Sequence, residues 1–224
     1  VMKMEFSQVA ALLWKGSLET LYMVMVSMIV SYILVIPLGV LLFVTDKNGI
    51  CRCKPVNVIL GVLVNLTRSI PFIILLIAIL PFTRWIIGTT IGINATVVPL
   101  IAAAIPFIAR MVESSLKEVD QGVIEAAQAM GSSPFQIIVK VLLPEAKPSL
   151  MVGCTIAFAT ILGYSAMAGF TGGGGLGAIA INYGYYRYKV NIMWATVFVL
   201  VVIVQVFQEL GMFIVNKTDK RIRN

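Results

Sequence analysis

Histidine is absent from this chain of 224 residues, and cysteine is sparse. Ser-His-Asp and Cys-His catalysis and histidine-ligated metal sites all require an imidazole, so these classes are excluded. Cys51 and Cys53 form a C-x-C pair without a histidine partner, and Cys154 lies inside an apolar run. We expect reduced, unreactive thiols, no catalytic residue and no metal site.

Charge is also scarce, because 12% of the residues are charged and 59% are hydrophobic. Ordinary globular domains have about 25% charged and about 45–50% apolar residues. A helix crosses a bilayer with roughly 20 apolar residues, and five continuous runs are long enough: 18–44, 56–82, 91–109, 150–168 and 190–215. Continuous rather than alternating runs exclude a β-barrel. The sequence therefore predicts an all-α integral membrane protein, with five transmembrane helices in one domain over residues 1–224.

Basic residues divide unequally between the two sides of such a bundle. Eleven follow the first run, the third run or the last run: Lys47, Arg52, Lys54, Arg110, Lys117, Lys140, Lys147, Lys217, Lys220, Arg221 and Arg223. Five lie on the other side: Lys3, Lys15, Arg84, Arg187 and Lys189. Since cytoplasmic loops are rich in Lys and Arg, we expect the N-terminus outside, the C-terminus inside and the segment 119–148 in the cytoplasm. Their spread over several loops argues against nucleic-acid binding, which needs a clustered basic face.

Sources of energy are missing from this chain. The acidic residues within the apolar runs are Glu19 and Glu209, each near a helix end, whereas ion-coupled carriers usually place titratable groups deep in the bundle. The sequence has no G-x-x-x-x-G-K-[ST] loop for ATP. If the chain transports a solute, another subunit must supply the energy.

The glycines at 172, 174 and 177 match G-x-G-x-x-G. No strand precedes them and no acidic residue follows about 20 residues later, so dinucleotide binding is rejected. Two interpretations stay open: a sharp turn or close approach of the backbone, which glycine permits, and a flexible outer loop.

The polar segment 119–148 carries strong helix-boundary signals. Asp120 can cap a short helix that runs to about Met130, and Gly131 is suited to the C′ position that ends it. A compact first helix is therefore expected in this segment.

A second start follows at Ser133-Pro134-Phe135-Gln136, which has the pattern of a capping box with proline at the first helical position. This second helix should stop before Pro144, because proline disfavours helix in the residue ahead of it. The pattern predicts a cytoplasmic two-helix elbow between the third and fourth spans. The alternative is an amphipathic connector that lies on the lipid headgroups.

Spaced residues in the elbow resemble a known family. Glu125-Ala126-Ala127, then Gly131, then Val141-Leu142-Leu143-Pro144 is similar to the cytoplasmic loop of permease subunits of bacterial ABC importers, which usually have isoleucine where this chain has Val141. The likeness covers nearly the whole chain. Four stretches resemble the methionine-importer branch: 68–72, 81–84, 125–146 and 163–167.

The resemblance implies a type I importer fold in the bacterial inner membrane. It implies a homodimer, two cytoplasmic ATPase subunits that bind ATP and Mg²⁺, an extracytoplasmic substrate-binding protein, and no cofactor on this chain. The elbow would contact the ATPase and act as a lever between inward-facing and outward-facing states. The implied coupling residues are Glu125, Ala126, Ala127, Met130, Gly131, Val141, Leu143 and Pro144.

Residues of the transport path are also expected: Met167, Tyr164, Ser165 and Arg68. The resemblance implies that Met167 narrows the path, and ordinary packing is the alternative. Arg68 lies about twelve residues into the second run, where a charge costs roughly 2.5–3.5 kcal/mol. It either faces a wet path or snorkels from a helix that starts later than Val56.

The expected function is that of a permease subunit that imports an amino acid, methionine by resemblance, and hydrolyses nothing. The nearest alternative is the same machine for another amino acid. A partner-independent channel or an ion-coupled carrier is the second alternative. The sequence shows no site for both a carboxylate and an amine, so the enantiomer preference, a substrate site on the permease and regulation by internal substrate are left open.

Overall fold

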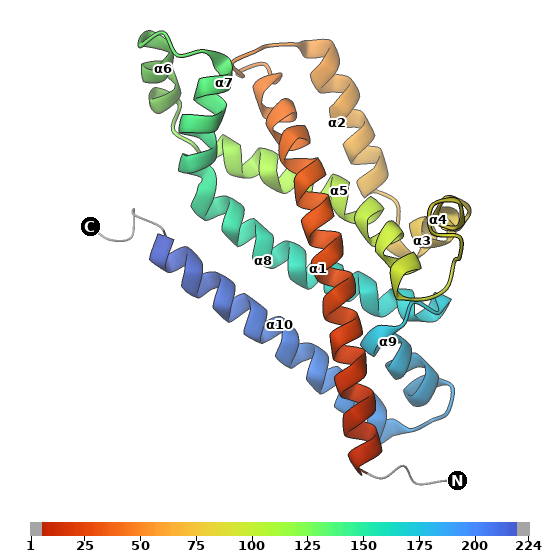
Figure 1. Ribbon diagram of the computed structural model, residues 1–224. Coiled ribbons are helices and arrows are strands. Elements are labelled where there is room, and N and C mark those ends of the chain that lie inside the picture. The colour runs from red at the N-terminus through yellow and green to blue at the C-terminus, as the bar shows by residue number, and fades with distance from the viewer. Residues whose placement is uncertain (1–5, 219–224) are drawn as a thin grey trace. The chain divides into compact units, whose positions relative to one another are not determined.

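The computed structural model describes residues 6–218, and all regular elements in that range are helices. Four helical runs are long and apolar enough to cross a membrane (Figure 1): α1 (Phe6–Val44), α5 (Ile93–Lys117), Pro134–Thr171, which contains α8 (Leu143–Ala168), and α10 (Val190–Thr218). A fifth is present if α2 (Lys54–Arg68) and α3 (Phe72–Ala78) count as one span. The all-α membrane fold is confirmed. Lys3, Lys220, Arg221 and Arg223, used in the charge count, lie outside the described residues.

The second span is broken, so the prediction of one helix over 56–82 is wrong. α2 ends at Arg68, α3 starts at Phe72, and α4 (Leu80–Ile87) follows. Pro71 is extended, with φ −56° and ψ 134°, and lacks the N–H that a continuous helix would use. It also biases the residue before it away from helix. α2 is therefore too short to cross a bilayer alone.

The third span is longer than expected. α5 does not end near Ala109 but continues to Lys117. Its last two turns are amphipathic, with buried Val112 and Leu116 among charged residues. The prediction was based on a continuous apolar run and therefore ended the helix too early. In these last turns only one face needs to be apolar.

Contacts between Cα atoms divide the chain into two units. The described residues of the first are 6–30, 70–104 and 158–209. Three short helices in this unit connect α8 and α10: η2 (Gly169–Thr171), α9 (Gly175–Ile179) and η3 (Ala180–Tyr185). A buried cluster of Leu176, Ile179 and Ile192 packs against Val9, Leu12 and Leu13 of α1.

The glycine-rich segment is a tight, packed turn. Gly172, Gly174 and Gly175 have positive φ of 81°, 86° and 69°, a region that glycine enters without strain. A Cβ atom on Gly169 would collide with the backbone of Gly177. The structure therefore favours the sharp turn and close approach over the flexible loop.

Side chains of α1 hold this turn in place. The N–H of Gly175 donates to Glu19 Oε2 at 2.9 Å, and the N–H of Leu176 donates to Thr20 Oγ1 at 2.8 Å. The Glu19 carboxylate thus accepts from the first turn of α9, where a negative group is favoured. Glu19 therefore has a structural contact with this turn.

The second unit comprises the described residues 31–69, 105–157 and 210–218. It contains α2, the end of α5, and the elements of the elbow: α6 (Gln121–Ala129), α7 (Pro134–Ile137) and η1 (Ile138–Leu142), a π-helical turn. Figure 1 shows α6 beside α7, in agreement with the contacts between them. A Cβ atom on Gly39 would collide with Val112, so α1 and α5 pack closely in this unit.

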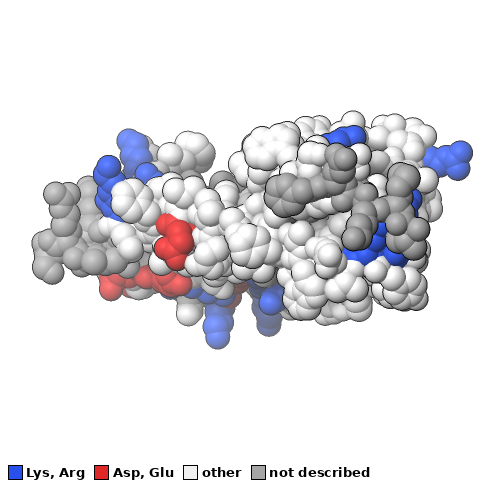
Figure 2. Space-filling model, turned by 90° about the horizontal axis from the view of Figure 1, so that it is seen from below, with Lys and Arg blue, Asp and Glu red and all other residues white. Residues whose placement is uncertain are grey.

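Apolar side chains dominate the surface. Along α10, Trp194, Phe198, Val201 and Phe213 are each more than half exposed. Most of the described surface seen in Figure 2 is uncharged. Such a surface is suited to lipid or to a partner chain rather than to water.

Candidate functional site

The first helix of the elbow has the boundaries that the sequence predicted. Asp120 caps α6, and its Oδ1 accepts from the N–H of Gly122 at 2.7 Å. At the other end the N–H of Ser132 donates to Ala127 O at 3.1 Å, and the N–H of Gly131 donates to Gln128 O at 2.9 Å. This pair of bonds is a Schellman motif, and it places Gly131 at φ +77°.

The second helix starts at the predicted capping box. Ser133 Oγ accepts from the N–H of Gln136, and the N–H of Ser133 donates to Gln136 Oε1 at 2.9 Å. Pro134 takes the first helical position, where its missing N–H costs nothing. The turn between α6 and α7 is therefore closed by hydrogen bonds on both sides.

The predicted stop before Pro144 is wrong. The chain passes through η1, where the N–H of Leu143 donates to Ile138 O five residues back, and continues as α8. A proline ring in an α-helix clashes with the carbonyl four residues earlier, and the wider π turn relieves this crowding. The second helix of the elbow and the fourth span are thus one uninterrupted helical run, Pro134–Thr171.

The elbow has a buried side and an exposed side. Ile124, Ile137 and Leu142 are at most 2% exposed and pack against their own chain. Met130 and Phe135, in contrast, are 79% and 74% exposed. We call the outward residues the elbow surface: Val123, Glu125, Ala126, Met130, Phe135 and Val139. Large apolar side chains held in the open by a well-capped turn are suited to contact with a partner.

The predicted coupling residues divide between these sides. Glu125, Ala126, Met130, Gly131 and Pro144 are exposed, whereas Val141 and Leu143 are half-buried. Ala127 is 3% exposed, so it packs within its own chain and does not lie on the elbow surface, contrary to expectation. Phe135 was not predicted as a contact residue. The available signal was its position inside the capping box, where an aromatic side chain is not needed to form the turn.

A buried carboxylate at the end of α5 was also missed. Glu113 is 5% exposed and accepts from Arg110 at 2.6 Å and from Lys117 Nζ at 2.7 Å. Arg110 also donates to Gly61 O at 3.0 Å and to Asn65 Oδ1 at 3.2 Å, both on α2. The i, i+3 and i, i+4 spacing of these three charges was the available signal, but the predicted span ended before it.

Lys117 carries this network to the loop after α1. Its Nζ lies 3.2 Å from Asp46 Oδ2. The backbone N–H of Lys47, and then Lys117, hold the pKa of the Asp46 carboxyl below its usual value. We call Asp46, Lys117, Glu113 and Arg110 the charge network.

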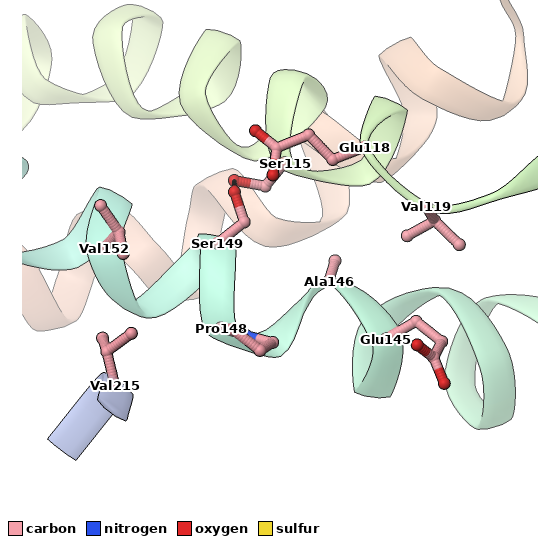
Figure 3. Close-up of a pocket in the computed structure, with 9 residues that line it drawn as sticks. All are labelled: Ser115, Glu118, Val119, Glu145, Ala146, Pro148, Ser149, Val152 and Val215. Atoms are coloured by element: carbon pink, nitrogen blue, oxygen red, sulfur yellow. Dashed lines mark hydrogen bonds between the residues drawn. The ribbon is translucent and has the colours of Figure 1, made fainter. Parts of the chain in front are cut away.

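A cavity of about 300 Å³ lies between the end of α5 and the start of α8 (Figure 3). Ser149 Oγ donates to Ser115 Oγ across it at 3.0 Å. Glu118 lines it from the turn after α5, Glu145 lines it from α8, and Val215 lines it from α10. No group of three or more Cys, Asp and Glu residues that could hold a metal ion occurs within residues 6–218.

The predicted path residues of α8 lie in three different surroundings. Tyr164 stacks on Phe72, with ring centroids 4.5 Å apart and planes at 6°. Ser165 is buried and donates to Leu162 O at 2.7 Å, which is a helix-internal bond. Met167 is 47% exposed at the end of α8 and is free of the close packing that an ordinary core methionine would have.

Arg68 is exposed at the last residue of α2. α2 starts earlier than expected, at Lys54, so the interpretation that requires a later start is wrong.

Residues 50–224 match the model of a protein family described as the binding-protein-dependent transport system inner membrane component. The chain is 50% identical over 210 residues to a Vibrio cholerae protein named probable D-methionine transport system permease protein MetI, which covers 94% of this chain and 93% of the relative. It is 43% identical to the Bacillus subtilis methionine import system permease protein MetP, over 93% of this chain and 94% of that protein.

Solved structures agree with these relatives. A chain of the inward-facing MetNI methionine ABC transporter has a TM-score of 0.95 and 46% identity, and the match covers 97% of this chain and all of that chain. An amino acid ABC transporter with 18% identity and a TM-score of 0.77 shares the fold. The matched relatives are membrane transport components and not enzymes. The chain belongs to the family of binding-protein-dependent transport system inner membrane components.

Proposed function

We propose that this chain is the permease subunit of an ATP-driven methionine importer. The elbow carries the proposal, because a capped turn that exposes Met130 and Phe135 is continuous with a membrane-spanning helix. A push on such a turn reaches the membrane helix without an intervening loop. We infer methionine as the cargo from the names of the relatives, which include D-methionine permeases.

The assembly would hold two copies of this chain and two ATPase subunits on the cytoplasmic side, with an extracytoplasmic protein that delivers the amino acid. ATP and Mg²⁺ would bind to the ATPase subunits. This chain would contribute the path and the elbow, including Glu125, Ala126 and Met130. Nucleotide and loaded binding protein would each favour one of two global states.

The proposed orientation has the N-terminus outside and the elbow in the cytoplasm. Cys51, which is exposed in the loop after α1, should then react with an impermeant maleimide only from the cytoplasmic side. A Tyr188→Cys variant, in which Cys51, Cys53 and Cys154 are replaced by serine, should react from the outside, since Tyr188 is 85% exposed. Labelling of each position from the opposite side would show that the topology is the reverse of the proposed one.

The test of function is ATP-dependent uptake of labelled methionine by the complex with its ATPase and binding protein in proteoliposomes. Unlabelled L- or D-methionine should compete, whereas other amino acids at equal concentration should not. If another amino acid competed and methionine did not, that amino acid would be the cargo instead. Uptake by the purified chain without the ATPase would instead favour a channel or carrier.

The coupling role has its own test. Glu125→Lys and Phe135→Ser should leave membrane insertion and the helical content unchanged while they weaken the link between ATP hydrolysis and uptake. Gln121→Lys is the matched control, because Gln121 is exposed on the same short helix but is not part of the elbow surface. Normal uptake per ATP hydrolysed in both elbow variants would contradict the coupling role.

A further inference from the structure

A second cavity, of about 290 Å³, lies in the second unit. Phe107, Met111 and Ser114 line it from α5, Glu118 lines it from the turn after α5, Ile156 lines it from α8, and Arg68 reaches it from the end of α2. The α5 residues recur at the spacing of one helix face. The cavity therefore has a wall with apolar and polar side chains and one basic residue from a different helix.

Arg68 is a charged residue of this cavity whose side chain is not paired with another group in the described part of the chain. Within residues 6–218 its guanidinium makes no hydrogen bond or ion pair, whereas Arg110, which lines the same cavity, is paired with Glu113. Arginine presents a planar fork of donors that fits a carboxylate. An unpaired fork that faces a cavity is a ready site for such a group.

The position of Arg68 along α2 favours a wet cavity. Arg68 is the fifteenth residue of α2, which places it about 21 Å along the helix from Lys54. A bilayer core is about 30 Å thick, and an exposed charge inside it needs water or a partner group. Ser114 and Glu118 supply further polar groups to the lining.

The length of the cavity decides which groups one small ligand can reach. Asn65 contacts Arg110, and α2 and α5 run in opposite directions (Figure 1), so Arg68, three residues further along α2, lies closer to the level of Phe107 than to that of Glu118. Glu118 directly follows α5 and is eleven residues beyond Phe107, a separation of about 16 Å along the helix axis. The carboxylate and ammonium of an α-amino acid share one carbon atom, so a molecule held at Arg68 does not reach Glu118.

We propose that this cavity is a holding site for an apolar α-amino acid in transit, with its carboxylate on Arg68 and its side chain against Met111 and Ile156. The hydroxyl of Ser114 can accept from the ammonium group. Glu118 lies at the far end and makes that end unfavourable for anions. The proposal rests on the proposed transport function and adds a substrate site on the permease itself.

Protection from alkylation tests the site directly. Ile156→Cys is made in a chain whose Cys51, Cys53 and Cys154 are replaced by serine, and the complex with its ATPase is treated with a maleimide in detergent. L-Methionine should slow alkylation at position 156, which is 46% exposed in the wild-type chain. L-Methionine methyl ester, which lacks the carboxylate, and L-glutamate, with its charged side chain, should protect at least about tenfold less well by concentration.

Arginine variants separate direct binding from an indirect effect. Arg68→Gln should raise the protecting concentration of L-methionine about tenfold or more, and Arg68→Lys should raise it less. Arg84→Gln is the matched control, since Arg84 is exposed but does not line the cavity. Equal protection in the Arg68→Gln variant would overturn the site, because protection would then arise from binding elsewhere.

The remaining outcomes separate this site from the proposed function. ATP-driven methionine uptake without protection of the Ile156→Cys thiol would overturn the site and leave the function intact. Protection by L-methionine without uptake would support the site and remove the transport role. Protection by inorganic phosphate as strong as that by methionine would overturn the assignment to an amino acid and indicate a site for phosphate groups, including those of lipids.

Discussion

Arg110 and Glu113 form an ion pair of 2.6 Å on one face of α5, and Glu113 is 5% exposed. The same carboxylate accepts from Lys117, while Arg110 reaches two groups on α2. One buried acid therefore holds the end of α5, α2 and, through Lys117, the loop after α1. A buried charge is stable only where such partners surround it.

Glu113→Gln should lower the stability of the second unit, because the amide cannot balance two cations. Removing one partner of a fully buried pair costs about 3–5 kcal/mol, and the half-exposed Lys117 should bring the loss below that range. The thermal midpoint of the protein in detergent measures it. Glu209→Gln is the control, since Glu209 is exposed, and an equal loss in both variants would contradict the role of the network.

The charge network also predicts a pH dependence. The Asp46 pKa is lower in the folded chain than in the unfolded chain, so its carboxylate stabilises the fold above the unfolded value of about 3.9. This contribution is lost as pH falls through the lower, folded value. The stability difference between the wild type and Asp46→Asn should therefore shrink from pH 7 to pH 3. A difference that is constant over this range would show that the Asp46 charge does not contribute.

Local signals predicted the elbow closely. Asp120, Gly131 and the capping box at Ser133 each act within three or four residues, and each was found as expected. Such hydrogen bonds depend on side-chain type and spacing alone, so a single sequence is enough to place them.

The predictions were wrong where the local structure depends on a neighbouring turn or on residues far away in the sequence. Pro144 was expected to end a helix, but the π turn before it accommodates the ring. The contacts of Arg110 with α2 could not be predicted, because its partners Asn65 and Gly61 lie 45 and 49 residues earlier in the chain. The spacing of the charged residues on α5 indicated that they could pair, but a search for continuous apolar runs does not detect such spacing.

Gly131 should tolerate asparagine better than valine. Its φ of +77° lies in the left-handed region, and nothing within 4 Å would meet a Cβ atom, so the cost is conformational rather than steric. Asparagine adopts this region with little strain, while a β-branched residue is expected to lose about 1–2 kcal/mol or more. Proteolysis at the elbow would report this difference, and equal resistance of both variants would show that the left-handed cap is dispensable.

Two glycines in the first unit provide a matched pair. Gly169→Ala should destabilise the protein strongly, because the new methyl group would meet the backbone of Gly177, which cannot move aside as a side chain would. Gly163→Ala has open space around the new atom and should be neutral or slightly stabilising, since alanine favours helix by about 1 kcal/mol. Equal thermal midpoints for the two variants would show that the turn is not tightly packed.

The hydrogen-bonded turn between α6 and α7 also bears on the energetics of association. Because Asp120, Gly131 and Ser133 fix the backbone before any partner arrives, the elbow surface is preorganised. A protein that docks there loses little of its binding free energy to ordering that backbone, which for a disordered segment would amount to about 1–2 kcal/mol for each residue fixed. Association at this turn should therefore be close to rigid-body docking, with Met130 and Phe135 already in place.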